Sequence, residues 1–288
     1  MKMRFVGKGH RVRLIVACAS LLVLVLAVCC GDGVRLHEQP DGPSTKVLTW
    51  NVNWGGPRPE AVVRALLEAD ADIVCLQETT PQWEAYLRPR LSELYPDIRF
   101  RHALPELNPD TQTPMPVRLA GGMAVLSKTK GREVAWIESL TTWFGGWILV
   151  FETPAGPLQM MNVHLQPSAT DDGEITISAY FGTGDRRLAE IERFAEKLQA
   201  DVPTVVAGDF NEQEGGDAIE WLEGKGLTNS LPEFDRDTDT WRWDTSLIKL
   251  RRRFDHILYT PSLYCYSAEV LNVGASDHLP VVAVFRKR

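Results

Sequence analysis

A short apolar stretch that ends in two polar side chains constrains the fold of this chain more than any other feature. Residues 205–211 read Val-Val-Ala-Gly-Asp-Phe-Asn, so a buried strand stops at Gly208 and is followed by Asp209 and Asn211. Side chains two residues apart on an extended chain lie on the same side. A carboxylate and an amide placed together can present a base and a hydrogen-bond donor to one phosphate. The stretch alone is equally typical of an Asp/Asn turn.

The same pattern recurs along the chain. Apolar runs predict strands that end on polar residues, and runs with helical spacing predict helices between them. Successive strand–helix steps favour a layered α/β fold. No repeat and no change of composition interrupts residues 46–288, so we expect one domain there. The strands are expected at 46–51, 71–76, 121–127, 133–137, 147–152, 158–165, 202–208, 254–259, 263–272 and 281–285, and the helices from 59 and at 83–94, 185–199 and 217–223. Loops are expected at 104–118, at 166–184 and after residue 229 up to 244.

The first thirty residues differ from the rest. A basic head is followed by an uncharged apolar run, residues 14–30, which predicts an export signal or a single membrane anchor. Residues 26–31 are similar to a lipoprotein cleavage site, and residues 31–45 have the composition of a linker. We therefore expect an exported protein, either attached to the membrane of the cell envelope through its N-terminus or secreted. Loss of the five positive charges in residues 1–30 would change the net charge from −7 to −12.

Polar residues at the strand ends form the candidate site. Open α/β sheets gather such ends along one edge, where their binding sites lie. Carboxylate and amide oxygens favour Mg²⁺, with Mn²⁺ or Ca²⁺ as alternatives, over a structural zinc. The residues are Asn51, Glu78, His164, Asp209, Asn211, Asp255, Asp277 and His278.

Seven short motifs occur in a fixed order from residue 46 to the C-terminus. They are Thr-Trp-Asn-Val, Leu-Gln-Glu, Gly-Gly-Met-Ala-Val-Leu-Ser, Asn-Val-His-Leu, Gly-Asp-Phe-Asn, Arg-Phe-Asp-His-Ile-Leu and Ser-Asp-His-Leu-Pro. This series resembles the endonuclease/exonuclease/phosphatase superfamily, which has the DNase I-like fold. The resemblance implies a four-layer sandwich of two mixed β-sheets flanked by helices, and metal-assisted hydrolysis of a phosphoester.

The resemblance also implies roles for these residues. Glu78 would be the principal metal ligand, with Asn51 beside it and Asp277 completing the site. Asp209 would orient or deprotonate the attacking water, and Asn211 would donate to the phosphoryl oxygen.

The remaining roles concern the phosphate and the leaving group. His278 would contact the scissile phosphate while Asp255 fixes its tautomer. His164 matches a second catalytic histidine and would act as the acid, and Arg187 would be a secondary substrate contact.

Some residues have two open interpretations. Trp241 and Trp243 could line a substrate wall, although nine Trp residues weaken the signal of any one. The basic run 249–253 could steer a phosphate or be a solvated face. The side chain of His256 should point away from that of Asp255, so we do not expect His256 in the site. Cys75 and Cys265 are expected to be buried thiols.

The preferred function is a metal-dependent phosphodiesterase that acts as a monomer. The motifs equally fit a DNA or RNA endonuclease, an inositol-phosphate phosphatase or a sphingomyelinase-like phospholipase, because the loops choose the substrate. A catalytically silent surface binding module is the alternative outside enzymes. The acidic charge disfavours long nucleic acids, whose binding needs a basic face. We therefore expect small phosphodiesters or lipid-linked head groups to be preferred.

Overall fold

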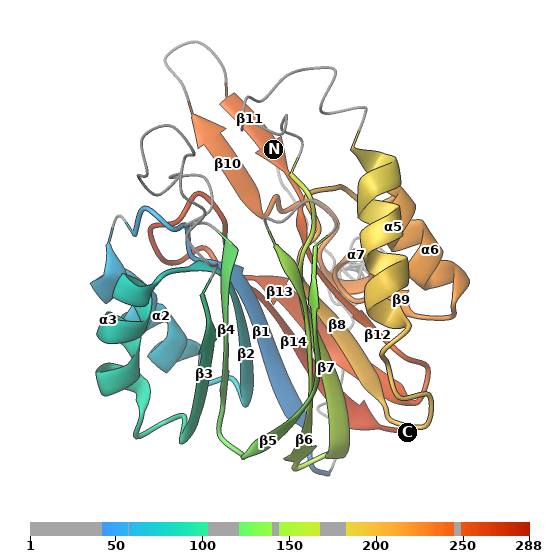
Figure 1. Ribbon diagram of the computed structural model, residues 1–288, viewed down its shortest axis with the longest axis horizontal. Helices are drawn as coiled ribbons and strands as arrows, with labels where there is room; N and C mark the ends of the chain where they lie inside the picture. The colour runs from blue at the N-terminus through green and yellow to red at the C-terminus, as the bar shows by residue number, and fades with distance from the viewer. Residues whose placement is uncertain (1–41, 57, 103–120, 140–143, 168–182, 245–248) are drawn as a thin grey trace, which may run out of the picture. The chain divides into compact units, whose positions relative to one another are not determined.

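Two six-stranded mixed sheets pack face to face, with helices outside them and a two-stranded hairpin beyond one edge (Figure 1). The computed structural model describes residues 42–56, 58–102, 121–139, 144–167, 183–244 and 249–288. The first sheet has the order β13-β14-β1-β2-β4-β3 and the second β5-β6-β7-β8-β12-β9. Each contains one parallel pair, β1 with β2 and β7 with β8, and its other pairs are antiparallel.

The strand bounds follow the apolar runs closely. The first sheet consists of β1 (Thr45–Asn51), β2 (Ile73–Thr79), β3 (Asp97–Arg101), β4 (Gly122–Ser127), β13 (Leu263–Val270) and β14 (Val281–Lys287). The second consists of β5 (Gly131–Glu138), β6 (Gly145–Thr153), β7 (Gly156–His164), β8 (Thr204–Asp209), β9 (Thr228–Asn229) and β12 (Asp255–Tyr259). The hairpin consists of β10 (Trp241–Asp244) and β11 (Lys249–Arg252).

Helices cover the outer face of each sheet, which completes four layers. The helices α2 (Pro59–Ala69) and α3 (Pro81–Leu91) pack on the first sheet, and α5 (Gly184–Ala195) and α6 (Asp217–Gly224) pack on the second (Figure 1). A single turn, α7 (Leu231–Phe234), follows β9. The expected α/β sandwich of two mixed sheets is therefore confirmed.

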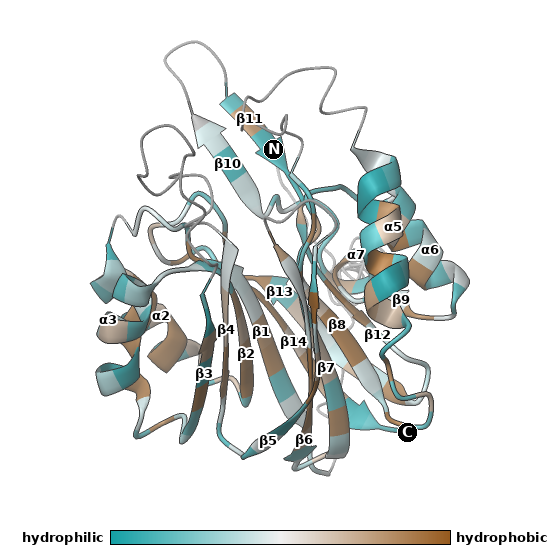
Figure 2. Cartoon of the chain, viewed as in Figure 1, coloured by the Kyte–Doolittle hydropathy of each residue, from teal (hydrophilic) through white to brown (hydrophobic). Residues whose placement is uncertain are grey.

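The continuous apolar run of β2 shows why the sheets are buried on both faces. Ile73 and Cys75 belong to the core between the sheets, whereas Val74 and Leu76 belong to the core under α2 and α3. This two-residue alternation is the normal consequence of strand geometry. Figure 2 shows the apolar residues concentrated along the strands. Cys75 and Cys265 are both buried free thiols, as expected.

Several element bounds differ from the sequence expectation. The second helix begins at Pro81 rather than at residue 83, because Thr80 Oγ1 caps it by accepting from Trp83 N at 3.2 Å. It ends at Leu91, earlier than residue 94, and the strand β3 that follows was not expected. The segment before residue 244, expected to be a loop, contains α7 and the first strand of the hairpin.

Other predictions fall where the structure gives no description. The predicted signal or anchor, residues 1–30, and most of the linker 31–45 lie outside the described residues, as does most of the loops expected at 104–118 and 166–184. The division into 1–30, 31–45 and 46–288 therefore stays a prediction. Within the described ranges, no helix combines the length and the hydropathy needed to cross a membrane.

Candidate active site

Three predicted site residues stand in one row across the second sheet. His164 at the end of β7 is in register with Asp209 at the end of β8, which in turn is paired with Asp255 at the start of β12. Gly208 lets β7 and β8 come this close, because a Cβ at that position would lie 1.9 Å from Val163 O. The strand ends therefore converge at one edge, as the sequence predicted.

Asn51 joins this row to the first sheet. Its Nδ2 donates to Asp209 Oδ2 at 3.0 Å and to Glu78 Oε1 at 2.9 Å. Its Oδ1 accepts from Asn53 N at 3.0 Å. Asn51 therefore bridges the carboxylate on the second sheet and the carboxylate on the first, and its role as a metal ligand stays a prediction.

Glu78 lies at a β-bulge in β2 and has a strained backbone conformation. The β2–β4 pairing shifts between Gln77 and Thr79, and Glu78 has a φ of 57°. Such a bulge turns one side chain out of the ladder and is common beside active sites. Gly122 accommodates it, because a Cβ there would lie 1.8 Å from Thr79 O.

The hydrogen bonds that Glu78 accepts come from neutral amide N–H groups. Besides the bond from Asn51, its Oε2 accepts from Trp54 N at 3.1 Å. Among the described residues, no Lys, Arg or His side chain forms an ion pair with it. Burial raises the pKa of Glu78 above its ordinary value, although the Asn51 bond opposes this.

Asp209 is the most heavily contacted side chain of the site. Its Oδ2 lies 3.5 Å from His164 Nε2 and 3.6 Å from His278 Nε2, in addition to the Asn51 contact. Its Oδ1 accepts from Asn211 N at 2.9 Å. Burial raises the pKa of Asp209 to about 7, and the nearby His278 charge opposes that rise.

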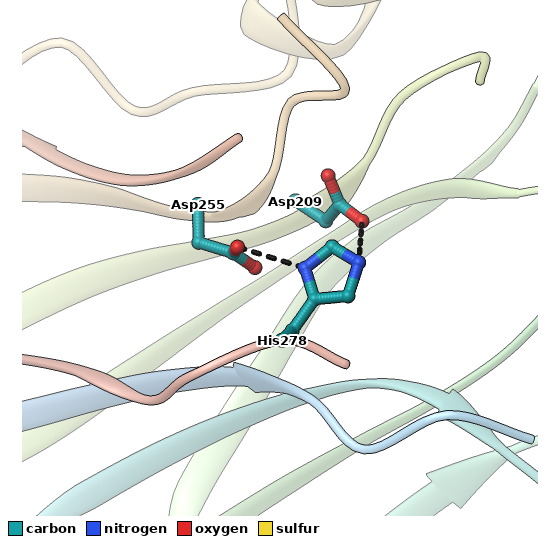
Figure 3. Close-up of side chains that lie close together, drawn as sticks. All are labelled: Asp209, Asp255 and His278. Atoms are coloured by element: carbon teal, nitrogen blue, oxygen red, sulfur yellow. Dashed lines mark hydrogen bonds and ion pairs between the residues drawn. The ribbon is translucent and has the colours of Figure 1, made fainter. Parts of the chain in front are cut away.

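His278 lies between two carboxylates (Figure 3). Its Nδ1 contacts Asp255 Oδ2 at 2.8 Å, and the same oxygen accepts from Thr240 Oγ1 at 2.7 Å. Burial opposes protonation of the ring, but the charges of Asp255 and Asp209 outweigh it and raise the pKa of His278 to about 10. The predicted contact of Asp255 with the ring is therefore present in the structure, and His278 is cationic at neutral pH.

His164 has the opposite electrostatic character. Its ring stacks on Phe144 with the centroids 3.7 Å apart, and its Nδ1 is buried without a hydrogen-bond partner among the described residues. Burial, followed by the charge of His278, lowers the pKa of His164 well below its ordinary value. A neutral imidazole at this position does not favour the acid role expected from the sequence.

Asp277 accepts hydrogen bonds from two segments that are distant in the chain, and from its neighbour Ser276 at 3.3 Å. Its Oδ1 accepts from Asn53 Nδ2 at 2.9 Å, and its Oδ2 accepts from Trp241 Nε1 at 3.2 Å. Burial would raise the pKa of Asp277, but the His278 charge and these bonds outweigh it, and the pKa falls below its ordinary value. Asp277 is therefore an anion at neutral pH.

The donor set fits a divalent cation at Glu78 and Asp277. Both are oxygen ligands, the two charges repel each other across the site, and Glu78 lacks an ion-pair partner among the described residues. Another group of possible ligand atoms belongs to Asp209, Asp255 and His278, and these atoms lie within 4.8 Å of one another. Within that group the His278–Asp255 contact of 2.8 Å is a hydrogen bond that leaves no room for an ion between the two atoms.

Two predicted site residues have other partners. Asn211 Nδ2 donates to Leu165 O at 2.9 Å, so this amide also fastens the end of β7. Arg187 is 6% exposed, and its Nε donates to the buried Glu212 at 3.0 Å. The guanidinium of Arg187 is therefore engaged in a buried ion pair, and the expected substrate contact stays a prediction.

The contacts of Arg253, His256 and Trp241 bear on the interpretations that the sequence left open. Arg253 forms ion pairs with Glu214 at 2.6 Å and Asp235 at 3.7 Å, so this end of the basic run is structural. His256 is buried against Asn229 at 3.0 Å and lies outside the site, as expected. Trp241 reaches Asp277 directly.

Sequence reasoning missed three contributors: Asn53, Trp54 and Thr240. Asn53 has a φ of 62° and holds Asp277, Trp54 offers its backbone N–H to Glu78, and Thr240 contacts Asp255. The spacing of Asn53 two residues after Asn51 was the available signal. The backbone N–H of Trp54 and the hydroxyl of the distant Thr240 give no signal in the sequence.

Comparison with known proteins agrees with this geometry. A sequence profile described as the Endonuclease/Exonuclease/phosphatase family matches residues 48–278. No curated protein matches the sequence.

Solved structures share the fold at low identity. An endonuclease/exonuclease/phosphatase from Beutenbergia cavernae aligns with a TM-score of 0.63 at 18% identity, covering 85% of this chain and 72% of that one. TDP2 of D. rerio, complexed with a single-strand DNA product, gives 0.61 at 18% identity over 85% and 99%. An AP endonuclease from Archaeoglobus fulgidus gives 0.60 at 20% identity over 84% and 99%.

Proposed function

The chain belongs to the endonuclease/exonuclease/phosphatase family and is a phosphoester-hydrolysing enzyme, and we propose that it is a phosphodiesterase in which Asp209 activates the attacking water. The observation that carries the proposal is the convergence of three nitrogens, from Asn51, His164 and His278, on Asp209 Oδ2. A buried carboxylate with a pKa raised to about 7 is a base matched to neutral pH.

The proposed step balances its protons through Asp209 and solvent. Water attacks phosphorus as Asp209 takes its proton, and the bond from phosphorus to the leaving oxygen breaks. That oxygen takes a proton from solvent, and Asp209 then releases its own proton to solvent. His278 is the cation of the site and would stabilise negative charge on the phosphoryl oxygens, with Asp255 holding its ring. His164 is neutral and would orient Asp209 through Nε2.

Glu78 and Asp277 would hold the divalent cation, with Asn51 beside them, and Mg²⁺ is the ion we propose. Its chemistry when bound is Lewis-acid stabilisation of charge on a phosphoryl oxygen. Glu78 and Asp277 bring two carboxylates to the site, and Glu78 has no ion-pair partner among the described residues, which supports this assignment. The anionic state of Asp277 supports it as well.

The substrate we propose is a small phosphodiester rather than a long nucleic acid. The net charge of −7 disfavours a polyanion, because phosphate contacts to a basic face supply most non-specific affinity. The burial of Arg253 in ion pairs removes one cation from the compact basic run. A nuclease activity is the second candidate, since TDP2 of the same fold is seen with a DNA product.

We further propose that the enzyme is exported and is held at the membrane by its N-terminal segment. The support is the basic head and apolar run of residues 1–30 and the composition of residues 31–45. We propose that the catalytic domain acts as a monomer.

A metal-dependent activity panel tests the proposed function. The full chain with Mg²⁺ is assayed on bis(p-nitrophenyl) phosphate, duplex DNA, RNA, sphingomyelin and inositol phosphates, with Asp209→Asn as the inactive control. Higher kcat/KM on the small diester than on duplex DNA at physiological salt is expected. Faster cleavage of plasmid DNA than of every small substrate would restore the nuclease, and no turnover of any ester would favour a silent binding module.

A further inference from the structure

Two exposed tryptophans stand beside the carboxylates of the site. Among the described residues, the large hydrophobic side chains that are exposed are Trp54, Leu67, Trp243 and Tyr264. Trp54 and Trp243 are each 43% exposed. Trp54 donates its backbone N–H to Glu78, and Trp243 lies beside Trp241, which donates to Asp277. Single exposed hydrophobics are normal, but two at one site require an explanation.

Trp54 belongs to a turn that the site itself orders. Its backbone N donates to Glu78, and the neighbouring Asn53 side chain donates to Asp277 Oδ1. The turn closes with Gly56 N donating to Asn53 O at 2.9 Å, and Trp83 Nε1 donates to the same oxygen at 3.0 Å. The backbone that carries the Trp54 indole is therefore fixed in advance.

Trp243 belongs to the hairpin, whose Trp241 contacts the second carboxylate oxygen of Asp277. It follows Trp241 by two residues on β10, so both rings lie on the same face, with centroids 6.4 Å apart. Trp241 Nε1 donates to Asp277 Oδ2, and Arg242 N donates to Asp277 O at 2.9 Å. The hairpin is therefore fastened to the site, and Trp243 lies outward from it.

We propose that Trp54 and Trp243 form an aromatic subsite for an unpaired nucleobase attached to the phosphate that the site binds. The inference rests on the proposed function and narrows its substrate class to short nucleotide phosphodiesters. Asp277 accepts from Asn53 on one oxygen and from Trp241 on the other, so the segments that carry Trp54 and Trp243 meet at this carboxylate. Indole rings stack on the face of any nucleobase, so this contact does not depend on which base is present.

The neighbours of both tryptophans favour a base over a lipid chain. Trp243 lies between Arg242 and Asp244, and Trp54 lies between Asn53 and Gly55. A surface that enters a membrane would need a contiguous apolar patch, whereas isolated indoles among polar groups suit a planar, partly hydrated ring. The acidic net charge is compatible with a mononucleotide or dinucleotide, which requires few phosphate contacts.

Calorimetry on the full chain with Mg²⁺ tests the subsite without relying on turnover. The probes are thymidine 5′-monophosphate and deoxyribose 5-phosphate, which differ by the base. The wild type should bind the nucleotide about tenfold more tightly, in the range of base–aromatic stacking. Trp54→Ala and Trp243→Ala should each lose most of that difference, while Trp54→Phe and Trp243→Phe keep much of it. Tyr264→Ala, an exposed aromatic on β13, is the matched control and should change nothing.

The outcomes separate the subsite from the catalytic proposal. Equal binding of the two probes by the wild type, or an equal loss for both in the Ala variants, would overturn the subsite. Tryptophan-dependent binding to sphingomyelin vesicles without a preference for the nucleotide would also overturn it, in favour of a lipid. A retained base preference together with no hydrolysis of any ester would support the subsite and contradict the proposed hydrolysis.

Discussion

Gln77 Nε2 donates to Asn162 Oδ1 at 2.8 Å and so ties the two sheets together inside the core. Gln77 immediately precedes Glu78 on β2, and Asn162 lies two residues before His164 on β7. Asn162 Nδ2 also donates to two backbone carbonyls of the first sheet, those of Leu76 at 3.2 Å and Ala124 at 3.1 Å. The buried amide pair therefore sets the position of Glu78, the proposed metal ligand, relative to Asp209, the proposed base.

Replacing Asn162 by Leu should lower both stability and metal affinity. The change removes three buried hydrogen bonds, one with Gln77 Nε2 and two with the carbonyls of Leu76 and Ala124, although Gln77 keeps its bond to Thr49 Oγ1. Each buried group left unsatisfied costs about 1–3 kcal/mol. Urea denaturation measures the stability, and Mn²⁺ titration by calorimetry measures the metal site. Gln159→Leu is the matched control, because Gln159 is a buried amide farther from the site end of β7. An equal loss of Mn²⁺ affinity in both variants would contradict the positioning role.

Asp255 and His278 should behave as one unit. Asp255→Asn removes the charge that keeps the ring protonated, and His278→Ala removes the ring, so either change should lower kcat by about 10²–10⁴, the scale of lost acid–base or electrostatic assistance. The double variant should be little worse than the worse single one. Full additivity of the two effects in steady-state assays would show that the pair does not act together.

Stability of the metal-free protein should fall as the pH rises. The pKa of His278 is raised from 6.5 to about 10, so its contribution is complete below pH 6.5 and is lost toward pH 10. The pKa of Asp209 is raised from 3.8 to about 7, so its contribution is lost over that lower window. Urea midpoints at about pH 7 and about pH 9.5 in EDTA measure the upper window. His278→Gln should reduce the fall, His102→Gln should keep it, and an unchanged fall in His278→Gln would contradict the assignment.

Arg187→Ala should damage the fold rather than substrate binding. It leaves Glu212 buried without its cation, which typically costs about 3–5 kcal/mol. Arg193→Ala, an exposed site on the same helix, is the control and should be nearly neutral. A large rise in KM with unchanged stability would restore the substrate contact that the sequence suggested.

The sequence predicted most of the layers because apolar periodicity is a local signal. The strand ends at Asp209 and His164 followed from the same signal, since sheet geometry brings such ends together. This local signal could not predict contacts between residues that are distant in the chain. The ion pair of Arg187 was not expected, because nothing local reveals that Glu212 is buried beside it.

The bulge at Glu78 shows the same limit at the site itself. Its φ of 57° depends on the approach of Thr79 to Gly122, more than forty residues away. The hairpin that carries Trp243 was expected to be loop at its first strand, because the mixed charges around it resemble a solvated segment. Its pairing and its attachment to Asp277 are tertiary contacts.

Chelation is the most direct test of metal-assisted phosphodiester hydrolysis at Glu78 and Asp209. The rate of bis(p-nitrophenyl) phosphate hydrolysis by the wild type is measured before EDTA, in excess EDTA, and after Mg²⁺ is restored. We predict that activity disappears in EDTA and returns with Mg²⁺, and that Glu78→Ala stays inactive throughout while remaining folded. Full activity of the wild type in excess EDTA would contradict the account.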